Sequence, residues 1–298
     1  GYHNFHIDKP KRLLISAAPF RDRVVHHALM NLIEPLFERQ FIHDSYANRK
    51  GKGTHAALDR CTYFLRRHQY VMHLDIRQFF PSIDHKILLS ILFRTIGDAK
   101  VSRLIEMIIA SGADVQKDDY EPIHFPGDDL FASLRPRGLP IGNLTSQHWA
   151  NVYLNELDQF AKRELKCRAY IRYVDDILLF GDDKHNLHDR RNAIINYLAN
   201  LRLAIHESKA HPRPSGTGVS FLGFQVFPAY RRLKPANGYA FQRRLKKMMN
   251  MVAQGQMTDK DFSGRLSSWL NHANYGDTWN LRRTLLNSAG ILGGNHER

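Results

Sequence analysis

Cysteines and long apolar runs are scarce in this sequence, and each scarcity narrows the class of protein. Only two of the 298 residues are cysteines, Cys61 and Cys167, and they form no Cys-x-x-Cys pattern. A reducing, intracellular compartment is therefore expected. No apolar run is long enough to span a bilayer, and the first residues do not resemble a signal peptide, so a membrane protein is not expected. Internal repeats and low-complexity tracts are lacking as well.

Acidic residues are outnumbered by basic ones. The chain has 43 Lys and Arg against 29 Asp and Glu, a formal net charge of +14. This excess predicts attraction to a polyanion and weaker binding at high salt. A chain of this length buries a substantial core, either as one large domain or as two to three subdomains.

The stretch Tyr173-Val174-Asp175-Asp176 lies between two apolar, strand-like runs. Asp is a poor strand residue, and a buried carboxylate is costly unless it binds a cation or accepts several hydrogen bonds. If the two runs pair as a hairpin, its turn presents both carboxylates at a tip where Mg²⁺ can be held. The alternative is that Asp-Asp marks a solvated turn.

A third carboxylate, Asp75, ends the strand-like run at residues 70–76. An amphipathic helix is predicted from about His85 to Ile96, and Asp84 is interpreted as its N-cap rather than as a ligand. Three carboxylates from two strand ends match the requirements of a two-metal centre.

Two basic segments are candidate phosphate contacts. Residues 7–16 are predicted to form a short hairpin with a basic turn. Residues 46–55 form a glycine-spaced loop before a helix that begins near His55, and free N–H groups at a helix start bind phosphate. A solvated turn and a flexible basic loop are the alternatives. The cations of the two segments are Lys9, Arg12, Arg49, Lys50 and Lys52.

Three later segments complete the pattern. Residues 112–137 are predicted to be an irregular excursion, without an assigned role. The turn-rich loop 138–147 precedes a helix that runs to about Lys166, with Ser146 as the expected N-cap and Gly142 allowing close approach of a ligand.

Past a boundary near 235–238, a helix carries a basic face opposite its apolar face. That face indicates a nucleic-acid groove, the alternative being a solvated surface. Its cations are Arg243, Arg244, Lys246 and Lys247.

The order of these elements resembles that of reverse transcriptases over nearly the whole chain. Asp75-Ile76 with Phe79-Phe80 resembles the first catalytic motif, and residues 138–147 resemble the loop and helix that pack on the nascent base pair. Three further matches follow in the family order: the metal-binding hairpin at Tyr173 to Asp176, the lysine after it at Lys209, and the primer grip at Phe221-Leu222-Gly223-Phe224.

The resemblance implies an α+β right-hand polymerase fold, with an antiparallel palm sheet plus helices and a helical thumb. The implied domains are fingers at 1–69, the first part of the palm at 70–96, a fingers or irregular insertion at 97–137, the second part of the palm with the primer grip at 138–235, and the thumb at 236–298.

The implied activity is RNA-templated DNA synthesis from a DNA or RNA primer and dNTPs, with two Mg²⁺ ions, for which Mn²⁺ is a possible substitute. Asp75, Asp175 and Asp176 would be catalytic, and Ile76 would join them at the metals. The implied dNTP contacts are Lys9, Arg12, Phe79, Phe80, Ile141, Gly142 and Lys209, with Phe80 excluding a ribose 2′-hydroxyl. The implied template and primer contacts are Arg49, Lys50, Lys52, Ser146, Gln147, Tyr173, Leu222, Gly223, Arg243, Arg244 and Lys247.

Within the family, the sequence is most similar to the reverse transcriptases of diversity-generating retroelements. Most relatives carry Gln where Ile141 stands, intron enzymes carry Pro where Gln147 stands, and residues 268–273 resemble the retroelement thumb. This similarity implies misincorporation opposite template adenine, a small basic accessory protein, and a bacterial or phage-encoded cytoplasmic enzyme. The usual segment before the fingers is not in the chain, and no endonuclease or maturase extension follows Arg298, which makes an intron enzyme less expected.

Other functions stay open from the sequence. A group II intron-type or defence-associated reverse transcriptase would share the chemistry. A catalytically silent RNA-binding protein would have no reason to crowd three carboxylates near a polyanion. A two-metal nuclease would leave Phe80 and the primer-grip-like segment unexplained.

Overall fold

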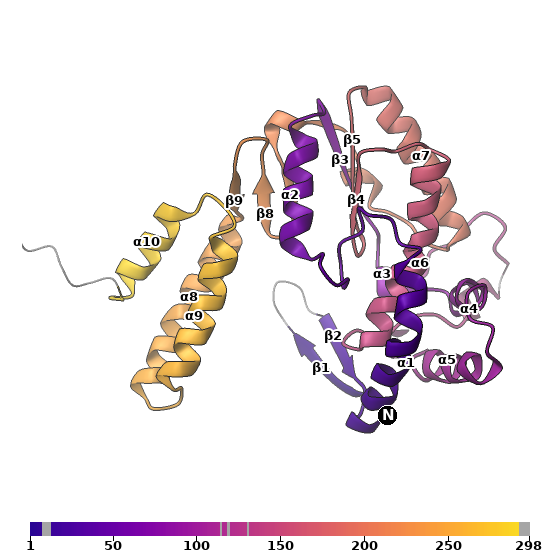
Figure 1. Ribbon diagram of the computed structural model, residues 1–298, viewed down its shortest axis with the longest axis horizontal. Helices are drawn as coiled ribbons and strands as arrows, with labels where there is room; N and C mark the ends of the chain where they lie inside the picture. The colour runs from indigo at the N-terminus through magenta and orange to yellow at the C-terminus, as the bar shows by residue number, and fades with distance from the viewer. Residues whose placement is uncertain (8–12, 114, 118–119, 130, 292–298) are drawn as a thin grey trace, which may run out of the picture. The chain divides into compact units, whose positions relative to one another are not determined.

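The computed structural model describes residues 1–7, 13–113, 115–117, 120–129 and 131–291. The chain divides into two compact units, which are described in turn (Figure 1). The first contains Gly1–Ala57 and Tyr70–Arg213, and the second contains Leu58–Gln69 and Pro214–Arg298. Among the described residues, no helix combines the length and the apolar character needed to cross a bilayer.

The central sheet of the first unit has the strand order β4-β5-β3-β6. Strands β3 (Tyr70–Asp75), β4 (Tyr170–Tyr173) and β5 (Asp176–Gly181) form antiparallel pairs, and the two-residue β6 (Arg213–Pro214) lies where the first unit ends. The alternating side chains of β3 and β5 bury Met72, Leu74, Ile177 and Leu179 on one face. This pairing confirms the predicted hairpin around the Asp-Asp dipeptide.

Helices cover this sheet, and α6 (Leu144–Arg163) is the most deeply buried of them. Trp149, Tyr153 and Leu157 on α6 are at most 1% exposed, and the helix packs against three other helices. The remaining helices of this unit are α1 (Phe20–Glu38), the start of α2 (Thr54–Leu65), α3 (Phe79–Ser82), α4 (His85–Phe93), α5 (Ala99–Ser111) and α7 (Lys184–Asn200), with 3₁₀ turns η2 (Ala132–Leu134) and η3 (Glu207–Lys209).

Two N-cap predictions have opposite outcomes. Asp84 caps α4 as predicted, because its carboxylate accepts a hydrogen bond from the Ile87 N–H at 3.0 Å. Ser146 is not an N-cap, since α6 begins two residues earlier and Asn143 occupies the cap position. The helix starts early because Leu144 packs against the core.

A separate hairpin is formed by β1 (His3–Ile7) and β2 (Leu13–Ala17), which pair antiparallel from His3 opposite Ala17 to Ile7 opposite Leu13. The predicted hairpin at residues 7–16 is therefore confirmed, except that its first strand lies earlier in the chain than predicted. Its turn, with the predicted phosphate contacts Lys9 and Arg12, lies outside the described residues.

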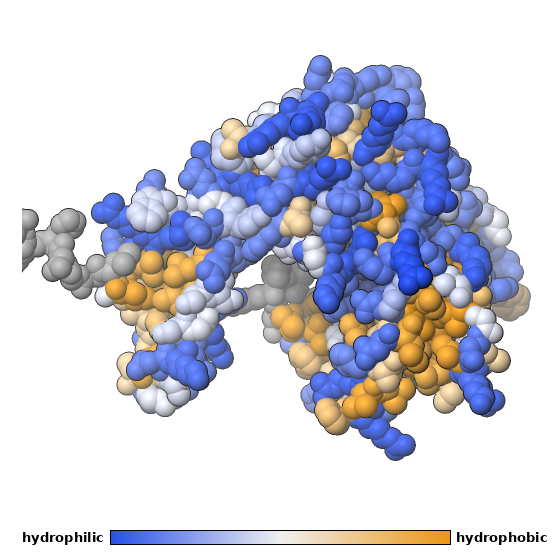
Figure 2. All heavy atoms as spheres, in the orientation of Figure 1, coloured by the Kyte–Doolittle hydropathy of each residue, from blue (hydrophilic) through white to orange (hydrophobic). Residues whose placement is uncertain are grey.

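Apolar side chains also gather on the surface of the first unit, over α1 (Figure 2). Leu29, Ile33 and Phe37 of this helix face the core, as the helical spacing predicts. Its outer face nevertheless carries exposed apolar residues, namely Phe20, Val24, Val25, Leu32 and Leu36.

The second unit combines a small sheet with three helices. Strands β7 (Val219–Phe221), β8 (Phe224–Val226) and β9 (Arg231–Leu233) pair antiparallel in that order. The helices are α8 (Pro235–Ala253), α9 (Asp259–Ala273) and α10 (Trp279–Ser288), and η4 (Ser215–Thr217) precedes the sheet. The two segments of this unit are Leu58–Gln69 and Pro214–Arg298, and the second contains the predicted thumb residues 236–298.

The helices of the second unit share an apolar core that the sequence pattern predicts. Phe241 and Trp269 stack with ring centroids 3.8 Å apart, and Leu245 and Met248 are buried beside them. Thr258 caps α9, accepting a hydrogen bond from the Asp261 N–H at 3.1 Å.

Candidate active site

The three predicted catalytic carboxylates lie at one end of the central sheet. Strands β4 and β5 are joined by the two-residue turn Val174-Asp175, and Asp176 is the first residue of β5. In the strand register Asp176 is opposite both Tyr173 of β4 and Asp75 of β3. The Asp175 carbonyl also accepts a hydrogen bond from the Ile76 N–H at 3.4 Å. Residues a hundred positions apart in sequence thus meet at one site.

The turn has an unusual backbone conformation. Val174 has φ of 54°, in the left-handed region that β-branched residues avoid at a cost of about 1–3 kcal/mol. Such a conformation persists only when surrounding contacts hold it.

One of those contacts comes from Arg172, which is fully buried two residues before the turn. Its Nη1 donates to the Val174 carbonyl at 3.3 Å and to Asn151 Oδ1 at 3.0 Å. Its Nε and Nη2 form a bidentate ion pair with the equally buried Asp158 on α6, at 2.7–2.9 Å. Tyr170 donates its hydroxyl to Asp158 at 2.7 Å. Sequence reasoning missed this network, although an Arg and an Asp within apolar runs were a signal for it.

The electrostatics of the turn centre on Asp175. Burial raises the pKa of Asp175, the negative charges of Asp176 and Asp75 act in the same direction, and together they bring it to about 6. The carboxylate is therefore costly to ionise without a cation. Asp176 has a histidine neighbour, because His73 Nε2 lies 2.7 Å from its Oδ1.

The three carboxylates do not form a ready-made metal cage. Within the described residues, no group of three or more His, Cys, Asp or Glu side chains is arranged to hold a metal ion. In this arrangement the Asp176 carboxylate is turned towards His73. The donor set nevertheless fits Mg²⁺, which prefers hard oxygen ligands and binds through one or two carboxylates plus substrate phosphates rather than all-protein cages. The elevated pKa of Asp175 is what such a cation would relieve.

The two phenylalanines after Asp75 have different surroundings. Phe79 is 3% exposed and packs in the core, which contradicts its predicted contact with a nucleotide. Phe80 is partly exposed and packs against Phe79, with ring centroids 5.4 Å apart. Its carbonyl accepts from the Leu139 N–H at 3.0 Å, which ties α3 to the loop 138–147.

The loop 138–147 is held on β2 by hydrogen bonds. The Ile141 carbonyl accepts from the Ser16 N–H at 2.8 Å, and the Asn143 side chain bonds the Ser16 carbonyl and the Ala18 N–H. Gly142 has φ of 112°, and a Cβ there would lie 2.9 Å from the Ile15 side chain. Close approach to β2 therefore explains the glycine without any ligand. Sequence reasoning left out Asn143 and the hydrogen bonds through which it holds this loop on β2.

Two predicted nucleic-acid contacts are buried instead. Ser146 is 2% exposed within α6, whereas Gln147 is partly exposed. The Arg49 side chain is 6% exposed and bonds the Glu38 carboxylate at 2.6 Å. It also donates to the carbonyls of Ile42 and Ser45. The burial of Ser146 and the hydrogen bonds of Arg49 indicate structural roles for these two side chains, in place of the predicted contacts with template or primer.

Four other predicted contacts of the first unit are at least partly exposed, namely Lys50, Lys52, Tyr173 and Lys209. Lys50 is exposed, and Lys52 donates to the His43 carbonyl at 2.9 Å while remaining partly exposed. The Tyr173 hydroxyl is 3.2 Å from Thr54 Oγ1. Lys209 is exposed on η3, which follows His206, and the His206 N–H bonds the Asp75 carbonyl.

In the second unit, Leu222 and Gly223 form the turn between β7 and β8, with φ of 46° and 87°. Both are partly exposed. The exposed face of α8 carries Arg243, Arg244 and Lys247, as predicted.

The antiparallel sheet, with an acidic hairpin beside a second acidic strand end, is consistent with a right-hand polymerase fold. Residues 7–226 match the family model "Reverse transcriptase (RNA-dependent DNA polymerase)". The match covers most of the chain, and the chain belongs to this family.

Relatives at low identity fit the same family. Protein YkfC of Escherichia coli (strain K12) is 29% identical over 146 residues, which are 47% of this chain and 35% of that protein. Group II intron-encoded protein LtrA of Lactococcus lactis subsp. cremoris is 27% identical over 141 residues, 47% of this chain and 21% of that protein. The chain thus spans about a third or less of the length of these curated relatives. Among solved structures, apo telomerase from Candida tropicalis has a similar fold, with a TM-score of 0.51 at 13% identity over 78% of this chain and 55% of that one.

Proposed function

We propose that the chain is an RNA-directed DNA polymerase whose catalytic residues are Asp75, Asp175 and Asp176. The observation that carries the proposal is the turn at Asp175, where a half-buried carboxylate with an elevated pKa lies beside two others at the end of one sheet. Such a cluster is unfavourable by itself and is typical of a site that works with bound cations.

The proposed reaction is attack of a primer 3′-hydroxyl on the α-phosphorus of a dNTP, with pyrophosphate leaving. Divalent cations, Mg²⁺ or in its place Mn²⁺, bound by the three carboxylates near Ile76 would stabilise the charge that develops on the phosphate oxygens. Arg172 holds the Val174 carbonyl and thereby keeps Asp175 at the turn. Phe80 presents an apolar ring that gives a ribose 2′-hydroxyl neither space nor a hydrogen-bond partner.

The remaining contacts are proposed by family resemblance. Ile141, Gly142 and Lys209, with Lys9 and Arg12, would contact the dNTP. Template RNA and primer would contact Lys50, Lys52, Gln147 and Tyr173 in the first unit and Leu222, Gly223, Arg243, Arg244 and Lys247 in the second. The fingers, palm and thumb divisions predicted from the sequence are part of the same proposal.

Two branches of the family are candidates for the biological role. Ile141 and Gln147 favour a diversity-generating retroelement enzyme, which would misincorporate opposite template adenine and work with a small basic accessory protein. The similarity to a group II intron-encoded protein favours an intron-type enzyme as the second candidate.

A primer-extension assay on an RNA template separates these proposals from the other classes. The purified chain, an annealed end-labelled primer, four dNTPs and Mg²⁺ should give a lengthened primer, and a chelator should abolish the product. A shortened primer would identify a nuclease, and an unchanged primer in complex with the protein would identify a silent RNA-binding protein. Either result would overturn the proposed activity.

A further inference from the structure

His73 on β3 contacts a proposed catalytic residue and has no role of its own in the proposed function. Its Nε2 atom lies 2.7 Å from Asp176 Oδ1. A carboxylate has no proton to give, so the imidazole donates this hydrogen bond and the carboxylate accepts it. Among the described residues, the Asp176 side chain has no other hydrogen bond or ion pair.

The register of the sheet brings the two side chains together. In the antiparallel pair of β3 and β5, His73 is opposite Leu178. Two residues further along β3, Asp75 is opposite Asp176. Alternate residues of a strand point to the same face, so His73, Asp75 and Asp176 share one face of the sheet. His73 and Asp176 are diagonal neighbours on that face, a separation that long side chains span.

The contact lies at the edge of the buried part of this face. On the same face, Val71, Leu178 and Phe180 are at most 1% exposed. The side chains of His73 and Asp176 are 31% and 33% exposed. A pair that is exposed to this extent contributes little to stability, so folding alone gives a weak reason for a histidine at this position.

Other contacts fix the main chain around the carboxylates. Arg172 donates to the Val174 carbonyl in the turn, and strand pairing places Asp75 opposite Asp176. Neither contact restrains the rotation of the Asp176 carboxylate about its own side-chain bonds. The hydrogen bond from His73 supplies that restraint.

The same hydrogen bond decides which oxygen of Asp176 is available to a cation. It occupies Oδ1 and leaves Oδ2 without a hydrogen bond among the described residues. One free oxygen suits Mg²⁺, which binds through one or two carboxylates and completes its shell with substrate phosphates and water. Metal ligands are commonly oriented by such outer partners, and loss of a partner costs about 10–100-fold in metal affinity or activity.

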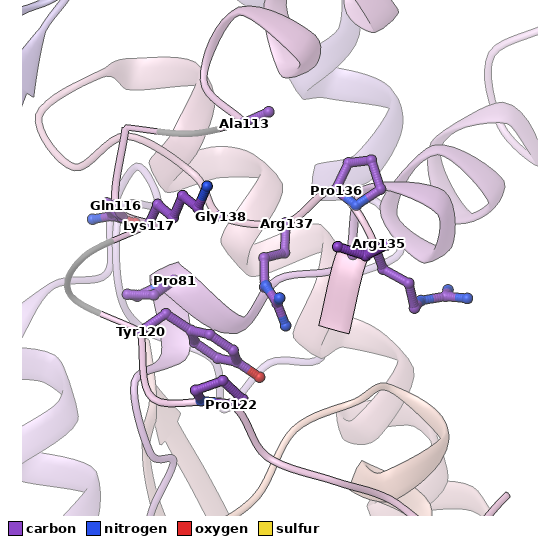
Figure 3. A pocket seen from close by; sticks show the side chains of 11 residues that line it. Pro81, Ala113, Gln116, Lys117, Tyr120, Pro122, Arg135, Pro136, Arg137 and Gly138 are labelled. Carbon is purple, nitrogen blue, oxygen red and sulfur yellow. The ribbon is translucent and has the colours of Figure 1, made fainter. Parts of the chain in front are cut away.

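The largest pocket described for the first unit gives His73 no other ligand. It has a volume of about 440 Å³ and is formed by α3, by the stretch after α5 and by the segment before the loop 138–147 (Figure 3). Neither His73 nor a proposed catalytic carboxylate is among the described residues that line it. The surroundings of His73 are therefore those of the carboxylate end of the sheet.

We propose that His73 is a positioning residue of the active site, which holds Asp176 Oδ1 and thereby presents Oδ2 to a divalent cation. This inference rests on the proposed function, because it takes Asp176 as a cation ligand. It needs a hydrogen-bond donor at the position of Nε2 and no proton transfer from the imidazole. A Gln side chain places its amide N–H near that position, whereas the shorter Asn side chain places its amide near the position of Nδ1.

The test is the dissociation constant of Mn²⁺ alone for the full chain at one fixed pH, measured from the electron paramagnetic resonance signal of free Mn²⁺. His73→Leu and His73→Asn should each weaken Mn²⁺ binding about tenfold. His73→Gln should stay within about threefold of the wild type, because it keeps a donor for Oδ1. Asp176→Asn should weaken binding at least as much as His73→Leu, because it removes the ligand itself.

His185→Leu is the matched control. It breaks a second contact between a histidine and an aspartate, since His185 Nδ1 lies 3.0 Å from Asp189 Oδ2 on α7. It should leave the affinity for Mn²⁺ unchanged. Urea unfolding in EDTA separates positioning from misfolding, because His73→Leu and His73→Asn should unfold at nearly the same urea concentration as the wild type.

The inference is overturned if His73→Leu and His73→Asn bind Mn²⁺ as tightly as the wild type, or more tightly, while Asp176→Asn binds it weakly. The proposed metal site would then stand without this partner. It is also overturned if His73→Gln loses as much affinity as His73→Leu, because a donor at the position of Nε2 would then not be what matters. Unchanged Mn²⁺ affinity in Asp176→Asn would contradict the proposed metal site itself and this inference with it.

Discussion

The buried ion pair between Arg172 and Asp158 gives the sharpest prediction about how the active-site turn is held. Both side chains are fully buried, and they are joined by a bidentate contact at 2.7–2.9 Å. Removing one partner leaves the other charge buried and unpaired. Arg172→Met is therefore expected to lower the free energy of unfolding by about 3–5 kcal/mol, a large share of the 5–15 kcal/mol typical of a folded protein.

The double variant Arg172→Met/Asp158→Leu should be far less destabilised than the sum of the two single variants. It removes both charges and fills their volume with apolar atoms, which is often nearly neutral for stability. Urea unfolding of the wild type, both single variants and the double variant gives the coupling energy, expected to be several kcal/mol.

Primer extension separates stability from positioning in the same set of variants. The double variant regains stability but still lacks the donor to the Val174 carbonyl. Its extension rate should stay at least about tenfold below the wild type, since small displacements of catalytic groups are costly. Additive destabilisation in the double variant, or a wild-type extension rate in it, would refute the reasoning.

Three further predictions concern the site itself. The pKa of Asp175 is raised to about 6, so its contribution to stability is present at low pH and is lost as pH rises through that value. Without metal, Asp175→Asn should therefore be more stable than the wild type by about 1–2 kcal/mol near pH 7.5 and not near pH 4, measured by urea unfolding; a gain independent of pH would contradict this. Phe80→Val should raise ribonucleotide incorporation at least about tenfold in a competition assay, and unchanged discrimination would remove the proposed gate. Ile141→Gln should lower misincorporation opposite template adenines by sequencing of products, and an unchanged error spectrum would count against the retroelement branch.

The parts of the fold that were predictable from sequence depend on short-range patterns. The apolar runs on each side of Asp175-Asp176 alternate or end at turn residues, so the hairpin and its partner strand ending at Asp75 could be inferred. The caps at Asp84 and Thr258 follow from local chemistry, because a side-chain oxygen there meets an N–H three residues later.

The parts that were not predictable depend on distant partners. Arg49 looks like a phosphate contact in its basic loop, but Glu38 lies close enough in space to draw its guanidinium inward. Gly142 is explained by Ile15, more than a hundred residues earlier, and no local pattern signals that contact.

The central claim is that Asp75, Asp175 and Asp176 form the centre of an RNA-templated polymerase. The most direct measurement is the single-turnover rate of dNTP addition to a primer on an RNA template with Mg²⁺. Asp175→Asn and Asp176→Asn should each lower this rate at least about a thousandfold, because charge stabilisation at a metal centre is worth several kcal/mol. Asp189→Asn on α7, whose side chain is 64% exposed, should keep the wild-type rate. Addition at the wild-type rate in Asp175→Asn or Asp176→Asn would contradict the account.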